Sequence, residues 1–263
     1  MHPHAETLWR GPRWTLAILL AVLGMLGPFS IDTYLPAFSG IASSLNASPV
    51  HMQQTLSAYL FGFAFMNLFH GALADSFGRR PVILWGLMAF TLASLGCALA
   101  QNVTQLIVFR AMQGLSCGAG VVVSRAIVRD IFPPTQAQKV MSQITIFFGL
   151  APAIAPIMGG WLFVSLGWHS IFWLLTAIGL ALWAVNFKML PESLHASQRQ
   201  PFSIPHLMRG YWQLCTDPRF LLLALASGIP FNGMFLYVLS APAFLGELLQ
   251  LQPTQFFWLF VLN

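Results

Sequence analysis

Long apolar stretches of about 20 residues, separated by shorter polar connections, repeat along the chain. A helix needs roughly 20 apolar residues to cross the hydrocarbon core of a bilayer. The pattern predicts membrane-spanning helices over residues 14–35, 53–74, 82–100, 105–127, 140–163, 170–190 and 219–240. An eighth stretch begins near Phe256 and stops at Asn263, which is too short to cross. We therefore expect the chain to be a C-terminally truncated fragment.

The composition supports an all-α integral membrane protein. Hydrophobic residues make up 57% of the 263 residues and charged residues only 7%, whereas roughly a quarter of a soluble domain is charged. The first apolar stretch carries Asp32 and lacks a convincing cleavage site, so we interpret it as a retained helix and not as a signal peptide. The three cysteines suggest no disulfide framework.

The basic residues predict the topology. Eleven of the 12 precede the first helix or lie in or beside alternate connections: Arg10, Arg13, Arg79, Arg80, Arg125, Arg129, Lys139, Lys188, Arg199, Arg209 and Arg219. The opposite connections, near 36–52, 101–104, 164–169 and 241–255, contain no Lys or Arg. Since basic connections stay inside the cell, the N-terminus is predicted to be cytoplasmic. The net charge of +5 then reflects topology and not nucleic-acid binding.

A polar segment separates six predicted helices from the seventh. We expect a six-helix bundle over 1–190, a central cytoplasmic loop over 191–218 and the start of a second bundle over 219–263. The short match between "PAFSG" after the first helix and "PAFLG" after the seventh is typical of parallel repeats in a transporter.

Two charged residues are predicted inside the membrane, where each costs roughly 2.5 to 3.5 kcal/mol on insertion scales. Asp32 is expected near the outer end of the first helix and Arg110 at a matching level in the fourth. We infer that they face a shared cavity, paired directly or through water. A fixed structural ion pair and a protonation switch both account for them. Gln113, one turn from Arg110, is expected at the same cavity.

Two glycine-rich stretches suggest close packing. In "RAMQGLSCGAG", Gly114 and Gly118 form a small face that lets a neighbouring helix approach. In "GLAPAIAPIMGG", Pro152 and Pro156 predict a kinked helix, which is either a permanent structural feature or a surface for rocking motion.

The residues give little support for an enzyme. The chain has only seven acidic residues, and it shows no phosphate loop, nucleophile elbow or paired-histidine metal motif. The seven histidines are scattered without ligand spacing, so no metal site and no cofactor are expected.

Four stretches combine features of one transporter family: "PFSIDTYLPAF", "GALADSFGRRP", "LIVFRAMQGLSCGAG" and "GLAPAIAPIMGG". Together they resemble the major facilitator superfamily, specifically its drug:proton antiporters of the Bcr/CflA type. The resemblance implies the major facilitator fold, alternating access by two six-helix bundles, and proton-driven efflux of amphipathic small molecules across the bacterial inner membrane. Protons are then the coupling ion, and the partners are drugs, the bilayer and a second bundle expected in the full-length protein.

The resemblance also implies roles for individual residues. Asp32 matches the proton carrier and Arg110 its partner, while Tyr34 and Gln113 match cavity residues. The cytoplasmic gate corresponds to Gly71, Asp75, Gly78, Arg79 and Arg80, and the antiporter motif to Gly149, Pro152, Pro156, Gly159 and Gly160. Asp75 is expected to accept hydrogen bonds from a helix N-terminus of the second bundle.

Two alternatives remain open from the sequence. The first is a transporter of the same superfamily that carries a single solute. The second is a truncated membrane remnant that does not transport, which the early stop of the eighth apolar stretch favours.

Overall fold

The computed structural model describes residues 12–241 together with Phe244 and Leu249, and these residues form helices and no strands. The α-helices are α2 (Arg13–Asp32), α3 (Phe38–Ser44), α4 (Pro49–Phe77), α5 (Arg79–Ala98), α6 (Val103–Ile131), α7 (Pro134–Leu166), α8 (His169–Met189), α9 (Ile204–Thr216) and α10 (Pro218–Ala241). Short 3₁₀ helices occupy Leu35–Ala37 and Ala196–Gln198.

Six segments of the described chain are long and apolar enough to cross a membrane, which confirms the predicted all-α membrane fold. The first of them differs from the prediction. It was expected to end at residue 35, but the helical path continues through Leu35–Ala37 and α3 as far as Ser44. Pro36 lies in the first turn of the 3₁₀ helix, where its missing N–H costs little, so the chain resumes a helix after the break.

Polar side chains cap the starts of α4 and α6. The Ser48 hydroxyl accepts from the His51 N–H at 3.3 Å, and Asn102 Oδ1 accepts from the Gln105 N–H at 2.9 Å. Gly78 follows the last residue of α4, and Gly167 follows the last residue of α7. Their φ angles are 104° and 82°. Only glycine adopts such backbone angles without steric cost.

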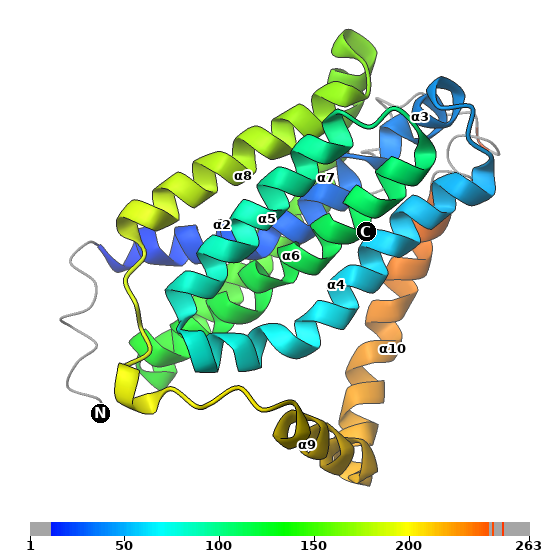
Figure 1. Ribbon diagram of the computed structural model, residues 1–263. Coiled ribbons are helices and arrows are strands. Elements are labelled where there is room, and N and C mark those ends of the chain that lie inside the picture. The colour runs from blue at the N-terminus through cyan, green and yellow to red at the C-terminus, as the bar shows by residue number, and fades with distance from the viewer. Residues whose placement is uncertain (1–11, 242–243, 245–248, 250–263) are drawn as a thin grey trace.

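In the bundle of Figure 1, α6 packs against α2, α4 and α5, while α7 covers α2 and α8 covers α5. The contact between α4 and α6 depends on glycine. A Cβ at Gly114 would lie 2.0 Å from the Tyr59 carbonyl oxygen, and a Cβ at Gly118 would lie 2.0 Å from Asn67 Oδ1. The predicted small face on this helix is therefore confirmed.

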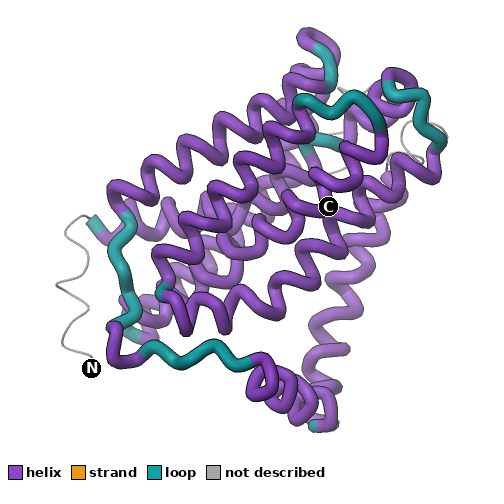
Figure 2. The backbone as a smooth tube through the Cα atoms, in the orientation of Figure 1, coloured by secondary structure: helices purple, strands orange, loops and turns teal. Residues whose placement is uncertain are grey.

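The segment over 191–218 was expected to be a polar loop, and this expectation was incomplete because it contains α9. Apolar residues recur in α9 at helical spacing, and Ile204, Met208 and Trp212 remain exposed on one side. Figures 1 and 2 show the connection after α8 running along one end of the bundle to α9, from which α10 rises. The predicted eighth helix lies outside the described residues, and the division into two bundles stays a prediction.

Candidate functional site

Asp32 is the last residue of α2 and lies at the break in the first span. Its exposed fraction is 2%. It was expected near the outer end of this segment, but the helical path runs 12 residues further, to Ser44. The direct ion pair between Asp32 and Arg110, one of the two expected arrangements, is not found among the described residues.

Arg110 lies between two tyrosine rings. Its guanidinium carbon is 4.6 Å from the ring centroid of Tyr34 and 4.4 Å from that of Tyr59. One terminal nitrogen donates to Gln113 Oε1 at 2.9 Å and to the Ser30 carbonyl oxygen at 3.4 Å. Nε and the other terminal nitrogen are buried without a partner in the described part of the chain. Aromatic faces thus stabilise this buried cation while two of its donors stay available.

Hydrogen bonds extend this cluster across four helical segments. Gln113 Nε2 donates to Ser94 Oγ at 2.7 Å, which links α6 to α5. The hydroxyls of Tyr59 and Ser30 are 2.7 Å apart. The Tyr34 hydroxyl lies 2.6 Å from Thr55 Oγ1, so the break after α2 is tied to α4. The structure therefore brings the predicted residues Tyr34, Arg110 and Gln113 together.

Tyr59 and Ser30 were missed by the sequence interpretation. Each is a polar residue inside a membrane span, which is a usable but weak signal, since Ser and Tyr are also common as packing residues there. Their proximity to Arg110 depends on how α2, α4 and α6 pack, and no local pattern encodes it.

The glycine- and proline-rich segment of α7, predicted as the antiporter motif, meets the same break through one glycine. A Cβ at Gly159 would lie 2.0 Å from the carbonyl oxygen of Thr33, the residue after Asp32, so no larger side chain fits. Pro156 and Gly160 are buried near it in sequence, and Pro152 is half-buried. A Cβ at Gly149 would meet no atom within 4 Å, and so the structure does not bring this residue into the contact. Both prolines lie inside one continuous helix.

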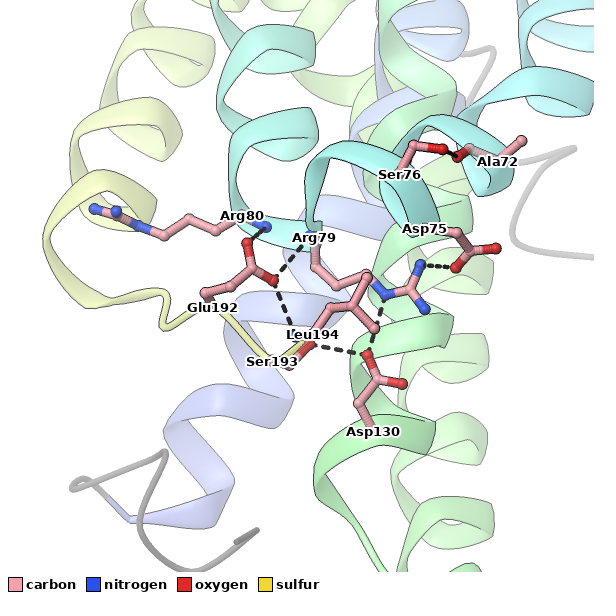
Figure 3. A network of polar contacts seen from close by, with 9 residues as sticks. All are labelled: Ala72, Asp75, Ser76, Arg79, Arg80, Asp130, Glu192, Ser193 and Leu194. Atoms are coloured by element: carbon pink, nitrogen blue, oxygen red, sulfur yellow. Dashed lines mark hydrogen bonds and ion pairs between the residues drawn. The ribbon is translucent and has the colours of Figure 1, made fainter. Parts of the chain in front are cut away.

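A second cluster surrounds the turn between α4 and α5 (Figure 3). The Arg79 guanidinium forms an ion pair with Asp75 and donates from Nε to Asp130 Oδ2 at 3.1 Å. Arg80 donates to the Phe187 carbonyl oxygen at 2.6 Å and lies over the Phe187 ring. The predicted gate residues Asp75, Arg79 and Arg80 therefore meet in one network. A Cβ at Gly71 would make only an ordinary contact with Val122 at 3.8 Å.

Glu192, which the sequence interpretation did not single out, caps the start of α5. Its carboxylate accepts from the backbone N–H groups of Arg79 at 2.9 Å and Arg80 at 3.3 Å. A Cβ at Gly78 would lie 2.4 Å from Glu192 Oε2, so glycine is needed here for space as well as for its positive φ. An acid directly after the sixth apolar stretch, on the side of the basic turn, was the available signal.

No group of three or more His, Cys, Asp or Glu side chains suited to a metal ion occurs in the parts of the chain that the structure describes. The two clusters are instead a buried polar centre at the break of the first span and an ion-pair network at one end of the bundle. Six spans around such a centre define a polytopic membrane protein of the transporter class.

The Major Facilitator Superfamily profile matches residues 11–263. The chain belongs to this superfamily, whose members are transporters and not enzymes. A bicyclomycin resistance protein homolog of Haemophilus influenzae is 36% identical over 94% of this chain and 62% of its own length. The uncharacterized MFS-type transporter YdgK of Bacillus subtilis is 38% identical over 95% of this chain and 63% of its own length. The Escherichia coli multidrug resistance protein MdtL is 36% identical over 66% of this chain and 45% of its own length.

Solved transporter structures share the fold. A bacterial homolog of the lysosomal transporter Spinster superposes with a TM-score of 0.72 at 14% identity, over 97% of this chain and 58% of that one. A D-xylose–proton symporter gives 0.68 at 14% identity, over 95% and 65%. The chain thus spans about three fifths of the length of the relatives that match nearly all of it.

Proposed function

We propose that the protein containing this chain exports drugs and other amphipathic small molecules across the bacterial inner membrane. In this proposal, two bundles alternate access to a central cavity, and inward proton flow drives export. The names of the relatives from Haemophilus influenzae and Escherichia coli, which refer to bicyclomycin and multidrug resistance, support efflux. The observation that carries the proposal is the buried Asp32 carboxylate at the helix break, between Ser30 and Tyr34, which both contact Arg110.

Asp32 is the proposed proton carrier. A carboxyl group at this depth is costly when charged and unpaired, so protonation and pairing with a cation are its two stable conditions. Arg110 has two guanidinium nitrogens without partners among the described residues, and it lies against Tyr34, two residues from Asp32. In the transport cycle, the Arg110 guanidinium would move from between the tyrosine rings to Asp32. The Asp32 carboxyl group would then release its proton and form an ion pair with Arg110. Tyr34 and Gln113 are the proposed cavity residues.

The α4–α5 turn is the proposed cytoplasmic gate. Asp75 is half-exposed even while it pairs with Arg79, so one face of its carboxylate is open to a further partner. We expect this partner to be a helix N-terminus of the second bundle, whose dipole favours an anion. In the full-length protein, Asp75→Ala should then impair transport, and full activity would contradict the gate.

The central experiment measures drug accumulation in cells that express the complete reading frame containing this chain, with and without a proton gradient. Wild type should lower accumulation only when the gradient is present. Asp32→Asn, which keeps the size of the side chain but cannot carry the proton, should abolish the gradient-dependent part. Asp217→Asn is the matched control, because Asp217 is an acid between α9 and α10, outside the bundle.

The outcomes separate the candidate functions. Unimpaired coupling in Asp32→Asn would remove Asp32 from the mechanism, and equal wild-type accumulation with and without the gradient would refute proton-driven export. A panel of unrelated drugs distinguishes multidrug efflux from transport of a single solute, since only the former lowers the accumulation of several of them.

A further inference from the structure

The contacts of Arg110 all lie inside the described bundle. Its side chain and the side chains of Tyr34 and Tyr59 on either side of it are fully buried. The Ser30 carbonyl oxygen accepts from the guanidinium because the first span breaks there: the Tyr34 N–H donates to the Ile31 carbonyl oxygen at 3.1 Å, one residue beyond Ser30. The surroundings of Arg110 are therefore built by the first, second and fourth spans themselves.

The ring of Tyr59 is anchored at both ends. Its hydroxyl lies 2.7 Å from Ser30 Oγ and donates to the Gly27 carbonyl oxygen at 3.2 Å. Its backbone carbonyl lies against Gly114 of α6, where a Cβ would come within 2.0 Å of the oxygen. The tip of this side chain is thus tied to α2 and its backbone to α6, while the Arg110 guanidinium lies 4.4 Å from the ring centroid.

Thr55, one turn before Tyr59 in α4, fixes the second ring. Its hydroxyl donates to the Met52 carbonyl oxygen at 2.6 Å. In the 2.6 Å contact between Thr55 Oγ1 and the Tyr34 hydroxyl, Tyr34 therefore donates and Thr55 accepts. Residues four positions apart lie on one face of a helix. A single face of α4 thus supplies one of the rings around Arg110 and holds the other in place.

Two positions compete for the Arg110 guanidinium. One lies between the tyrosine rings, as in this structure, and the other is an ion pair with Asp32. An aromatic face holds a cation most strongly when both are desolvated, which is the condition here. Loosening either ring weakens the first position and leaves the attraction of the carboxylate unchanged, so the guanidinium shifts toward Asp32.

We propose that Thr55 and Tyr59 of α4 are positioning residues that hold Arg110 away from Asp32 and so keep the carboxyl group able to carry a proton. Both act through Arg110 and contact neither the proton nor the drug. This inference rests on the proposed function, because it takes Asp32 as the proton carrier. It deepens that function by naming the two side chains that decide between the protonated carboxyl group and the ion pair.

The test measures the ionised fraction of Asp32 by infrared spectroscopy on the purified full-length protein in lipid. A film is perfused first with neutral and then with acidic buffer. The C=O stretch that appears reports the carboxylates that were ionised at neutral pH, and the part of it that is missing in Asp32→Asn belongs to Asp32. In wild type this Asp32 band should be small, because Arg110 lies between the rings.

Three variants loosen the two rings to different degrees. Tyr59→Leu removes one ring face and should enlarge the Asp32 band by about fivefold, since Arg110 then pairs with the carboxylate. Tyr59→Phe keeps the face and loses the hydroxyl, and it should enlarge the band by only about twofold. Thr55→Val keeps the volume but releases the Tyr34 hydroxyl, and it should also give about twofold.

The matched controls are Phe90→Leu and Thr91→Val in α5. Both side chains are buried and lie at Gly179 of α8, where a Cβ would come within 3.2 Å of Phe90 Cδ1 and 2.5 Å of Thr91 Oγ1. The Thr91 hydroxyl donates within α5, to the Leu87 carbonyl oxygen at 2.8 Å. These variants remove a buried ring and a buried hydroxyl without touching the rings around Arg110, so they should leave the Asp32 band unchanged.

Transport provides a second measurement. In gradient-driven efflux, Tyr59→Leu should lower the maximal rate by about fivefold and leave the drug concentration at half-maximal rate unchanged, because Tyr59 acts on Arg110 and not on the drug. A rise in that concentration at an unchanged maximal rate would make Tyr59 a drug-binding residue and would overturn the proposal.

Equal Asp32 bands in wild type and Tyr59→Leu, or an equal enlargement in Phe90→Leu, would also overturn it. If Tyr59→Leu does not fold, unchanged bands in both Tyr59→Phe and Thr55→Val have the same meaning. The infrared measurement uses no drug and no proton gradient, so it fails or succeeds separately from the transport function. A wild type that does not export drugs, with bands in the expected order, would refute export and leave the positioning roles of Thr55 and Tyr59 in place.

Discussion

At the scale of single residues, the glycines of α6 and α7 differ sharply in their surroundings. Gly114→Ala would place a methyl group 2.0 Å from the Tyr59 carbonyl oxygen, while Gly149→Ala would meet no atom within 4 Å. We expect Gly114→Ala to lower the free energy of unfolding by about 1–3 kcal/mol, because α4 and α6 must separate. Gly149→Ala should change it by about 1 kcal/mol or less. Thermal unfolding of the purified variants in detergent checks both values.

The same two variants test what the glycines do in transport. A shift at Gly114 also moves Tyr59, whose ring lies against Arg110, so Gly114→Ala should reduce drug efflux along with stability. If Gly149→Ala proves as destabilising as Gly114→Ala, the packing of α4 on α6 does not set the stability. If it abolishes efflux at unchanged stability, Gly149 acts through a contact outside the described residues.

At the scale of elements, the start of α5 depends on a residue from the segment after α8. No side chain of the α4–α5 turn itself caps α5, and the Glu192 carboxylate supplies the acceptors for Arg79 and Arg80. Loss of such a cap costs about 0.5–2 kcal/mol. Glu192→Ala should therefore speed hydrogen exchange of the Arg79 and Arg80 amides by about twofold to thirtyfold.

Two further variants sharpen this measurement. Glu192→Gln keeps an oxygen acceptor and should lie between wild type and Glu192→Ala. Arg199→Gln removes only a 3.9 Å contact between partly exposed side chains and should leave the amides of α5 unchanged. Equal exchange in wild type and Glu192→Ala would show that α5 does not need this cap.

At the scale of the whole molecule, the topology predicted from the basic residues can be tested with one native cysteine. Cys215 of α9 is exposed, whereas Cys97 and Cys117 are buried. With a cytoplasmic N-terminus, a membrane-impermeant maleimide should label Cys215 only after the cells are permeabilised. In a Cys215→Ser background, Ser44→Cys, at the exposed end of α3, should react in intact cells. The reverse pattern would place the N-terminus outside.

Hydrophobic length alone determined the number of spans between Trp14 and Met189. Six apolar stretches predict six helices, because backbone groups in lipid must bond within their own segment. The exact ends were less predictable. The first span passed its expected end at residue 35 because its path resumes after Pro36. The helix α9 was overlooked because its one-sided apolar face disappears in an average over a polar segment.

The candidate site was predictable in its members but not in its contacts. Asp32, Arg110 and Gln113 stand out because charged and polar residues are costly in the membrane, wherever the helices pack. Which partner Arg110 contacts depends on tertiary structure, and here two tyrosine rings replace the expected carboxylate. Glu192 and Arg79 are separated by 113 positions, and their hydrogen bond exists only because α8 returns the chain to the α4–α5 turn.

The sequence by itself therefore determined the membrane fold, the spans and the polar residues that are costly to bury. These follow from the free energy of transferring single residues and segments from water into lipid. Tertiary structure decided the pairing of Arg110 with Tyr34 and Tyr59, the cap on α5 and the hydrogen bond between Tyr34 and Thr55. Each of these requires helices distant in the chain to approach closely, and the approach is set by the packing of glycine faces between them.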